Sequence, residues 1–268
     1  MLLDFAASTA AAAEAEAMKK YVAAKAADEA LEDLTPSTEA GTSSEDSDFD
    51  SEEEEESAPT PPSAFDVEDT IIIFDWDDTI LPSTWMQREG LTLDASSRPS
   101  EQQAEQLRTL ARLSARTLRS AKRLGSVILV TNAERGWIEL SCHKFMPSLL
   151  PLVESMKIIS ARSAYEKMGV TSPVEWKCRA FQSECSSFYR CTTADRKRNV
   201  LSLGDSINER SALILVTKDM RNCVAKSLKF MEQPDVTQLQ REHELVSRSI
   251  PQIVGHDGSL DLRVQVSA

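Results

Sequence analysis

The chain contains few histidines and cysteines, the residues that bind zinc in proteins. It holds three histidines and five cysteines among 268 residues, and no two cysteines are spaced as C-x-x-C. These numbers exclude the usual zinc-binding patterns. Because the cysteine count is odd and no paired spacing occurs, we expect reduced cysteines, as in a cytoplasmic or nuclear protein.

Long apolar runs and an early basic residue are missing as well. No run of 18 apolar residues occurs, so no membrane span is predicted. The first basic residue is Lys19, and Asp4, Glu14 and Glu16 precede it, which argues against a secretory signal or a transit peptide. We expect neither a membrane nor a nucleic acid as partner, and the sequence leaves the oligomeric state open.

The acidic charge is concentrated in the N-terminal quarter. The formal net charge is −13, with 20 acidic and 3 basic residues in positions 1–69 and 23 acidic and 27 basic residues after them. Residues 35–64 consist largely of Thr, Ser, Pro, Glu and Asp, a composition that buries too little apolar surface to fold. The mildly basic remainder suits phosphorylated substrates.

These shifts in composition predict three segments. They are an acidic, disordered low-complexity tail at 1–66, a catalytic domain at 67–254 and a C-terminal tail at 255–268.

An apolar run that ends in carboxylates is the most informative feature of the chain. Ile71–Phe74 reads as a strand buried on both faces, and Asp75, Asp77 and Asp78 follow it directly. Ligands of open α/β sheets bind at the carboxyl ends of the strands. Three acidic side chains at such an end predict a site for a divalent cation, with one carboxylate left for chemistry.

Strand and helix patterns alternate after residue 70. Strands are predicted at 71–75, 126–131, 156–160, 199–203 and 225–230, and helices at 100–124, 133–146, 162–168, 176–188, 208–215 and 235–249. Alternating elements with right-handed crossovers give a doubly wound parallel sheet. The predicted fold class is therefore α/β.

Four motifs in order resemble the haloacid dehalogenase superfamily of phosphotransferases. They are Asp75-x-Asp77-x-Thr79, the strand ending in Thr131, the downstream Lys177, and the stretch Gly204–Glu209, which reads Gly-Asp-Ser-Ile-Asn-Glu. The resemblance covers about residues 68 to 232. It implies a three-layer Rossmannoid fold, Mg²⁺ as cofactor and a phosphorylated substrate.

The carboxylates take separate roles under this resemblance. Asp75 is the candidate nucleophile and metal ligand, because an aspartate attacks phosphorus once a cation has neutralised the phosphate. Asp77 is the candidate general acid and base, with its backbone carbonyl in the metal shell, and Asp205 is the second carboxylate ligand. The alternative for Asp75 and Asp77 is a turn or helix-capping role, and Asp78 is expected to be exposed or to cap the next turn.

The phosphate-binding residues come from the later motifs. Thr131, with the amides that follow it, is predicted to hold a phosphate oxygen, with Asn132 as a further donor; the alternative is that Thr131 only caps a helix. Lys177, at the expected start of a helix, is predicted to stabilise Asp75 and the phosphoryl group, with Lys157 and Lys167 as rivals.

Glu209 departs from the family pattern, in which an Asp is usual at its position. Its longer side chain is expected to hold a metal-bound water or Lys177, and a solvated helix carboxylate is the alternative.

The spacing of the motifs leaves no room for a large cap domain. Trp85 and Met86 are expected to form a small flap over the site, so bulky substrates such as phosphoproteins are favoured. With Asp at position 77, the resemblance implies a phosphate-ester hydrolase acting through an aspartyl-phosphate. A phosphomutase, which needs a closed site, and an interaction protein that retains the fold without strong catalysis are the alternatives.

Overall fold

A computed structural model describes residues 64–193 and 195–266. The chain divides into two units, Met1–Thr60 and Pro61–Ala268, and the described residues all belong to the second. The predicted disorder of the acidic tail therefore falls almost wholly outside the described residues.

One six-stranded sheet, parallel throughout, organises the described chain. The strands are β1 (Thr70–Phe74), β2 (Ser126–Thr131), β3 (Lys157–Ser160), β4 (Arg198–Gly204), β5 (Cys223–Lys229) and β6 (Leu260–Arg263), in the spatial order β3-β2-β1-β4-β5-β6. The order runs outward from β1 in both directions, which is the doubly wound arrangement predicted from the sequence.

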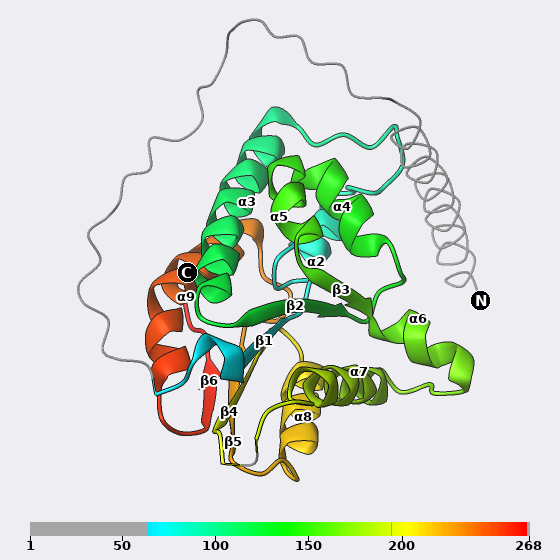
Figure 1. The fold of residues 1–268 in the computed structure, drawn as a ribbon. Helices are drawn as coiled ribbons and strands as arrows, with labels where there is room; N and C mark the ends of the chain where they lie inside the picture. Colours follow the sequence, from blue (N-terminus) through cyan, green and yellow to red (C-terminus); the bar gives the residue numbers. More distant parts are fainter. Residues whose placement is uncertain (1–63, 194, 267–268) are drawn as a thin grey trace, which may run out of the picture. The chain divides into compact units, whose positions relative to one another are not determined.

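Helices cover both faces of this sheet. They are α2 (Ser83–Arg88), α3 (Glu101–Lys122), α4 (Trp137–Phe145), α5 (Leu150–Glu154), α6 (Ala161–Tyr165), α7 (Pro173–Phe188), α8 (Ile207–Thr217) and α9 (Val236–Gly255), with short 3₁₀ turns at Val67–Asp69, Pro147–Leu149 and Glu166–Met168. Helices α3, α4, α5 and α9 lie on one side and α6, α7 and α8 on the other (Figure 1). None of the described helices is long and apolar enough to cross a membrane.

The central strand β1 is apolar on both sides because both sides face a core. All five of its residues are buried. Ile72 and Phe74 belong to the core under α3 and α9, whereas Ile71 and Ile73 belong to the core under α7 and α8. Alternate side chains of a strand point to opposite faces, so an unbroken apolar run fills two cores at once.

Local sequence signals set the ends of the long helices. The predicted capping box of Ser100 and Gln103 is present at the start of α3. Asp235 and Gln238 form a second one at the start of α9. Helix α9 extends to Gly255, beyond the predicted end at 249, and includes Pro251.

Two helix starts differ from the prediction. Helix α4 begins at Trp137, not near 133, because Gly136 has a φ of 89° and holds the chain in a loop up to that residue. Helix α7 begins at Pro173, with Ser172 as its cap, so Lys177 lies in the second helical turn and not at the start.

The predicted flap residues belong to the core. Trp85 and Met86 lie on α2 and are buried against the cluster beneath α3. The flap prediction is wrong because both side chains gain more from packing under the helices than from covering a polar opening.

The segment after residue 254 adds a strand to the sheet. Strand β6 pairs in parallel with β5, from Lys226 opposite Leu260 to Lys229 opposite Arg263. Leu262 packs against the core. The segment 255–268, expected as a tail, therefore contributes the edge of the sheet.

Candidate active site

The carboxyl ends of three neighbouring strands bring the predicted site residues together. Asp75 follows β1, Thr131 ends β2 and Asp205 follows β4. Strand β1 lies between β2 and β4, where the winding of the sheet reverses. Such a reversal leaves a crevice at the carboxyl ends of the strands, which is the usual ligand position in open α/β sheets.

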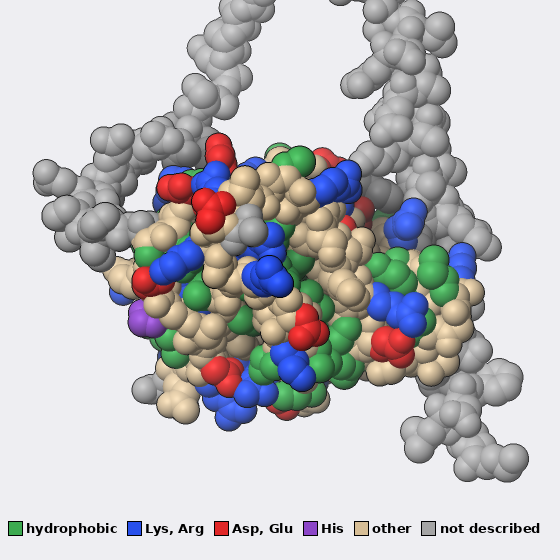
Figure 2. All heavy atoms as spheres, turned by 60° about the horizontal axis from the view of Figure 1, so that its bottom comes forward, with side chains coloured by type: hydrophobic (Ala, Val, Ile, Leu, Met, Phe, Trp, Pro, Cys, Tyr) green, Lys and Arg blue, Asp and Glu red, His purple; other side chains and the backbone are tan. Residues whose placement is uncertain are grey.

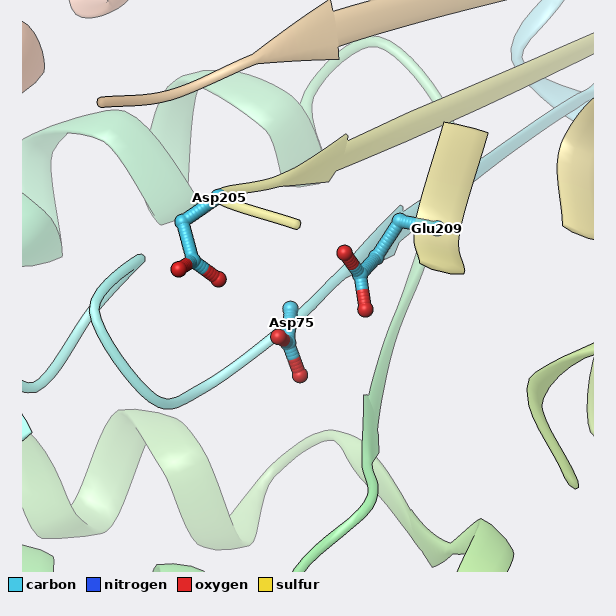
Figure 3. A group of neighbouring side chains, drawn as sticks. All are labelled: Asp75, Asp205 and Glu209. Atoms are coloured by element: carbon cyan, nitrogen blue, oxygen red, sulfur yellow. The ribbon is translucent and has the colours of Figure 1, made fainter. Parts of the chain in front are cut away.

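Three carboxylates converge at this point. One oxygen from each of Asp75, Asp205 and Glu209 lies within 4.8 Å of the others. Figure 3 shows the three side chains turned toward a common space, from the ends of β1 and β4 and from the first turn of α8. Carboxylate oxygens are the ligands that Mg²⁺, Ca²⁺ and Mn²⁺ prefer, so this donor set fits a hard divalent cation.

Lys177 is the only positive side chain bonded to this cluster within the described chain. Its Nζ lies 2.6 Å from Asp75 Oδ1 and 2.9 Å from Glu209 Oε1, and it donates to the Val130 carbonyl at 2.6 Å. All three donors of the ammonium are thus used, and the side chain is 1% exposed. Burial disfavours the charged form, but Asp75 and Glu209 outweigh it and raise the pKa of Lys177.

Glu209 serves mainly to hold Lys177 and the start of α8. Its Oε2 accepts from the backbone N–H of Ser206 at 3.1 Å and from the Ser206 hydroxyl, while Oε1 pairs with Lys177. Burial alone favours the protonated carboxyl, but Lys177 and the Ser206 hydroxyl outweigh it, so the pKa of Glu209 is lowered. Of the roles that the sequence allowed for Glu209, the structure shows the contact with Lys177 and excludes the solvated carboxylate.

Gly204 makes room for this longer side chain. A Cβ at position 204 would lie 2.5 Å from Cγ of Glu209, a distance that no packed pair tolerates. The glycine is therefore required by the glutamate that folds back over it, and not only by the turn toward Asp205.

The cluster carries more negative than positive charge. With all three carboxyls ionised, the one ammonium would leave an excess of two negative charges. Burial raises the pKa of Asp75, and the charges of Glu209 and Asp77 add to this effect while Lys177 opposes it. Burial and the charge of Glu209 likewise raise the pKa of Asp205 to about 7. A divalent cation would offset this excess.

The side chain of Asp77 turns away from the cluster to two other donors. Its Oδ1 accepts from the indole Nε1–H of Trp137 at 2.9 Å, and its Oδ2 accepts from the Thr131 hydroxyl at 3.3 Å. Burial raises the pKa of Asp77, although the bonds from Trp137, Ser83 and Thr131 oppose the rise. A raised pKa suits a carboxyl that has to hold and release a proton.

The side chains of Thr131 and Asn132 form hydrogen bonds within the protein. The Thr131 hydroxyl donates to Asp77 and accepts from the Ala133 N–H at 2.9 Å, so it orders the loop before α4 and caps no helix. The Asn132 amide donates to the Pro173 carbonyl at 3.2 Å, which ties the start of α7 to β2. Asn132 therefore helps to place the helix that carries Lys177.

Asp78 and Thr79 hold the loop that follows Asp77. Asp78 is buried with a φ of 50°, and its carboxylate accepts from the backbone N–H of Thr84 at 2.8 Å and from the Thr84 hydroxyl. Asp78 thus bonds the first turn of α2, whose cap position is Pro82, and the predicted exposure is wrong. The Thr79 carbonyl is bonded at 2.9 Å by Nε2 of His243, from α9.

Two open grooves flank the carboxylate cluster. One, with a volume of about 350 Å³, lies between the ends of β2 and β3 and is lined by Thr131, Arg135 and Glu139 among others. The second, of about 790 Å³, lies at the ends of β5 and β6 and includes Lys229 and Arg263. Lys229 also donates to the Asp205 carbonyl at 2.8 Å, which joins this groove to the carboxylate cluster.

Comparisons of the chain with protein-family models, with curated proteins and with solved structures each find no match. The geometry of the site therefore carries the functional argument.

Among the residues predicted from sequence, Asp75, Lys177, Asp205 and Glu209 form one cluster, and Asp77 and Thr131 form a second pair beside it. Sequence reasoning missed Trp137. No motif marks it, because its contact with Asp77 depends on how α4 packs above the end of β2. The rival lysines Lys157 and Lys167 are both exposed, and Lys157 pairs with Glu184.

Proposed function

We propose that this protein is a Mg²⁺-dependent phosphate-ester hydrolase of the haloacid dehalogenase type, acting through an aspartyl-phosphate. The observation that carries the proposal is the pairing of Asp75 with Lys177 at the reversal point of the sheet, with the carboxyl of Asp77 held two residues further on. A nucleophile, its cation and a separate proton carrier are the groups that hydrolysis in two steps needs.

The chain's own residues support both steps. A carboxylate oxygen of Asp75 attacks phosphorus, the ester P–O bond breaks, and its electron pair stays on the leaving oxygen, which takes a proton from Asp77. Water then attacks the phosphorus of the aspartyl-phosphate, gives a proton to Asp77 and releases the Asp75 carboxylate. Lys177, 2.6 Å from Asp75, offsets negative charge where the phosphoryl group enters.

Asp75 and Asp205 are the residues that would hold Mg²⁺, while Glu209 is engaged by Lys177 and Ser206. A cation there neutralises the charge of the phosphate and so lets a carboxylate approach it.

The layout of the chain favours a bulky substrate such as a phosphoprotein. Helices α2 and α3 fill the interval between the first two motifs, and the next interval holds elements of the core, so the described chain has no inserted cap. The two grooves extend the site on either side. Figure 2 shows Lys and Arg side chains interspersed with acidic and hydrophobic ones on one face of the molecule.

The test is a hydrolysis screen against phosphopeptides and small phosphate esters, with and without Mg²⁺. Wild-type protein should hydrolyse at least one substrate, and Asp75→Asn should remove turnover with the fold intact, because an amide does not attack phosphorus effectively. Asp257→Asn, which removes an exposed carboxylate paired with Lys197, is the matched control.

Two results would contradict the proposal. Asp75→Asn retaining more than about a tenth of wild-type activity would exclude Asp75 as the nucleophile. Full activity in excess chelator would exclude the metal. A folded protein that hydrolyses none of the substrates would favour the non-catalytic interaction protein.

A further inference from the structure

Trp137 and Thr131 each hold one carboxyl oxygen of Asp77, and the Ser83 hydroxyl bonds the same carboxyl. Oδ1 lies 2.9 Å from Nε1 of Trp137, on the first residue of α4, and Oδ2 lies 3.3 Å from the Thr131 hydroxyl, at the end of β2. The position of Trp137 is itself fixed, because its N–H donates to the Glu134 carbonyl and its carbonyl accepts from the Ser141 hydroxyl at 2.6 Å.

The two partners differ in chemistry. An indole N–H only donates, whereas a hydroxyl both donates and accepts. Oδ1 is therefore an acceptor toward Trp137, whereas the Thr131 hydroxyl can either donate to Oδ2 or accept from it. The Thr131 oxygen accepts from the Ala133 N–H at 2.9 Å and retains one lone pair, so it accommodates Oδ2 in either state by turning its hydroxyl.

We propose that Trp137 is a positioning residue for proton transfer by Asp77. Its indole fixes the orientation of the carboxyl and keeps Oδ2 on the side of Thr131. The inference rests on the proposed hydrolysis, in which Asp77 gives a proton to the leaving oxygen as the ester bond breaks and regains one from the attacking water. Without the indole, the carboxyl loses the hydrogen bond that holds Oδ1 and can rotate.

Leaving groups of different basicity separate this role from a structural one. p-Nitrophenolate departs without a proton, whereas the alkoxide of benzyl phosphate needs one, and kcat/KM reports only the steps up to formation of the aspartyl-phosphate. Trp137→Phe should lower kcat/KM for benzyl phosphate by about tenfold or more and for p-nitrophenyl phosphate by less than about threefold. Where phenylalanine loosens the fold, replacement of Trp137 by benzothienylalanine retains the ring shape and removes only the N–H.

Trp176→Phe is the matched control. Trp176 lies on α7, and its buried indole donates to the Val170 carbonyl at 2.7 Å. The variant therefore loses an indole hydrogen bond of the same kind, but none to a carboxyl of the site. The ratio of the two kcat/KM values should stay at the wild-type level.

A readout independent of turnover tests the contact itself. The indole ¹⁵N–¹H resonance of Trp137, assigned by its loss in Trp137→Phe, should shift upfield and exchange faster with solvent in Asp77→Ala. Asp77→Asn, which retains an acceptor oxygen, should leave it close to the wild-type position.

The outcomes distinguish the two proposals. Equal losses for both esters in Trp137→Phe, or an indole resonance indifferent to Asp77→Ala, overturn the positioning role and leave the hydrolase standing. A wild-type protein that hydrolyses neither ester in Mg²⁺, nor any substrate of the screen, overturns the hydrolase and with it the role of Trp137 in proton transfer.

Discussion

The buried side chain of Lys177 connects several elements of the fold at the site. It pairs with Asp75 and Glu209, and it also donates to the Val130 carbonyl of β2. It therefore connects β1, β2, α7 and α8 around one ammonium. A buried ion pair adds little net stability over apolar packing, but removal of one partner leaves the other charges uncompensated.

Lys177→Met should accordingly destabilise the fold and abolish turnover. Two buried carboxylates would lose the one cation bonded to them among the described residues, at a cost of about 3–5 kcal/mol in the free energy of unfolding. Lys157→Met is the control, since Lys157 is 56% exposed in its pair with Glu184 and its loss should cost less than about 1 kcal/mol. Urea denaturation of both variants checks this, and similar losses for the two would contradict the assignment.

At the scale of elements, helix α9 places two ionisable side chains in the interior. Glu242 accepts from the Met231 N–H at 2.7 Å through Oε1, while its buried Oε2 has no hydrogen-bond partner within the described part of the chain. Burial raises the pKa of Glu242 to about 7 and lowers that of His243 to about 4. A neutral His243 donates from Nε2 to the Thr79 carbonyl and accepts at Nδ1 from Thr117, so α9 and α3 together hold the loop that follows Asp77.

Stability should fall with rising pH through Glu242. The pKa of this carboxyl is raised from 4.5 to about 7 in the folded state, so its contribution is complete below pH 4.5 and is lost as the pH rises through 7. Glu242→Gln removes this loss, and its free energy of unfolding relative to wild type should rise by up to about 3 kcal/mol between pH 5 and pH 8.

Chemical denaturation at a series of pH values measures this difference. Because the variant and the wild type are compared at equal pH, the contribution of His243 to stability cancels. That contribution rises with pH between about 4 and 6.5, whereas the contribution of Glu242 falls. Glu244→Gln, at an exposed position of the same helix, controls for the loss of a carboxylate. A pH-independent difference for Glu242→Gln would show that Glu242 is ionised in the fold at no cost.

At the scale of the whole molecule, the excess negative charge of the site should make stability depend on divalent cations. We expect 10 mM Mg²⁺ to raise the melting temperature of wild-type protein by a few degrees, of the order that one bound ligand produces. Asp205→Asn should remove most of this response and should stabilise the metal-free protein, because it relieves repulsion with Glu209.

Thermal unfolding at constant ionic strength, with NaCl in place of MgCl₂, checks both parts of this expectation. An Asp205→Asn protein that still responds fully to Mg²⁺ would place the cation elsewhere.

The sequence by itself determined the sheet and the meeting of two carboxylates at its edge. An apolar run such as Ile71–Phe74 has to be buried on both faces, and parallel strands put Asp75 and Asp205 at one edge whatever the details of packing. The capping box at Ser100 could also be predicted from the sequence, because it joins two residues only three positions apart.

Only the tertiary structure decided the contacts made by residues distant in the chain. The bond from Trp137 to Asp77 spans 60 residues, and that from His243 to Thr79 spans 164. The burial of Trp85, the pairing of β6 with β5 and the fold of Glu209 over Gly204 depend likewise on neighbours that no local pattern names. Periodicity reports which face of an element is buried, but the partner across that face follows from how all elements pack together.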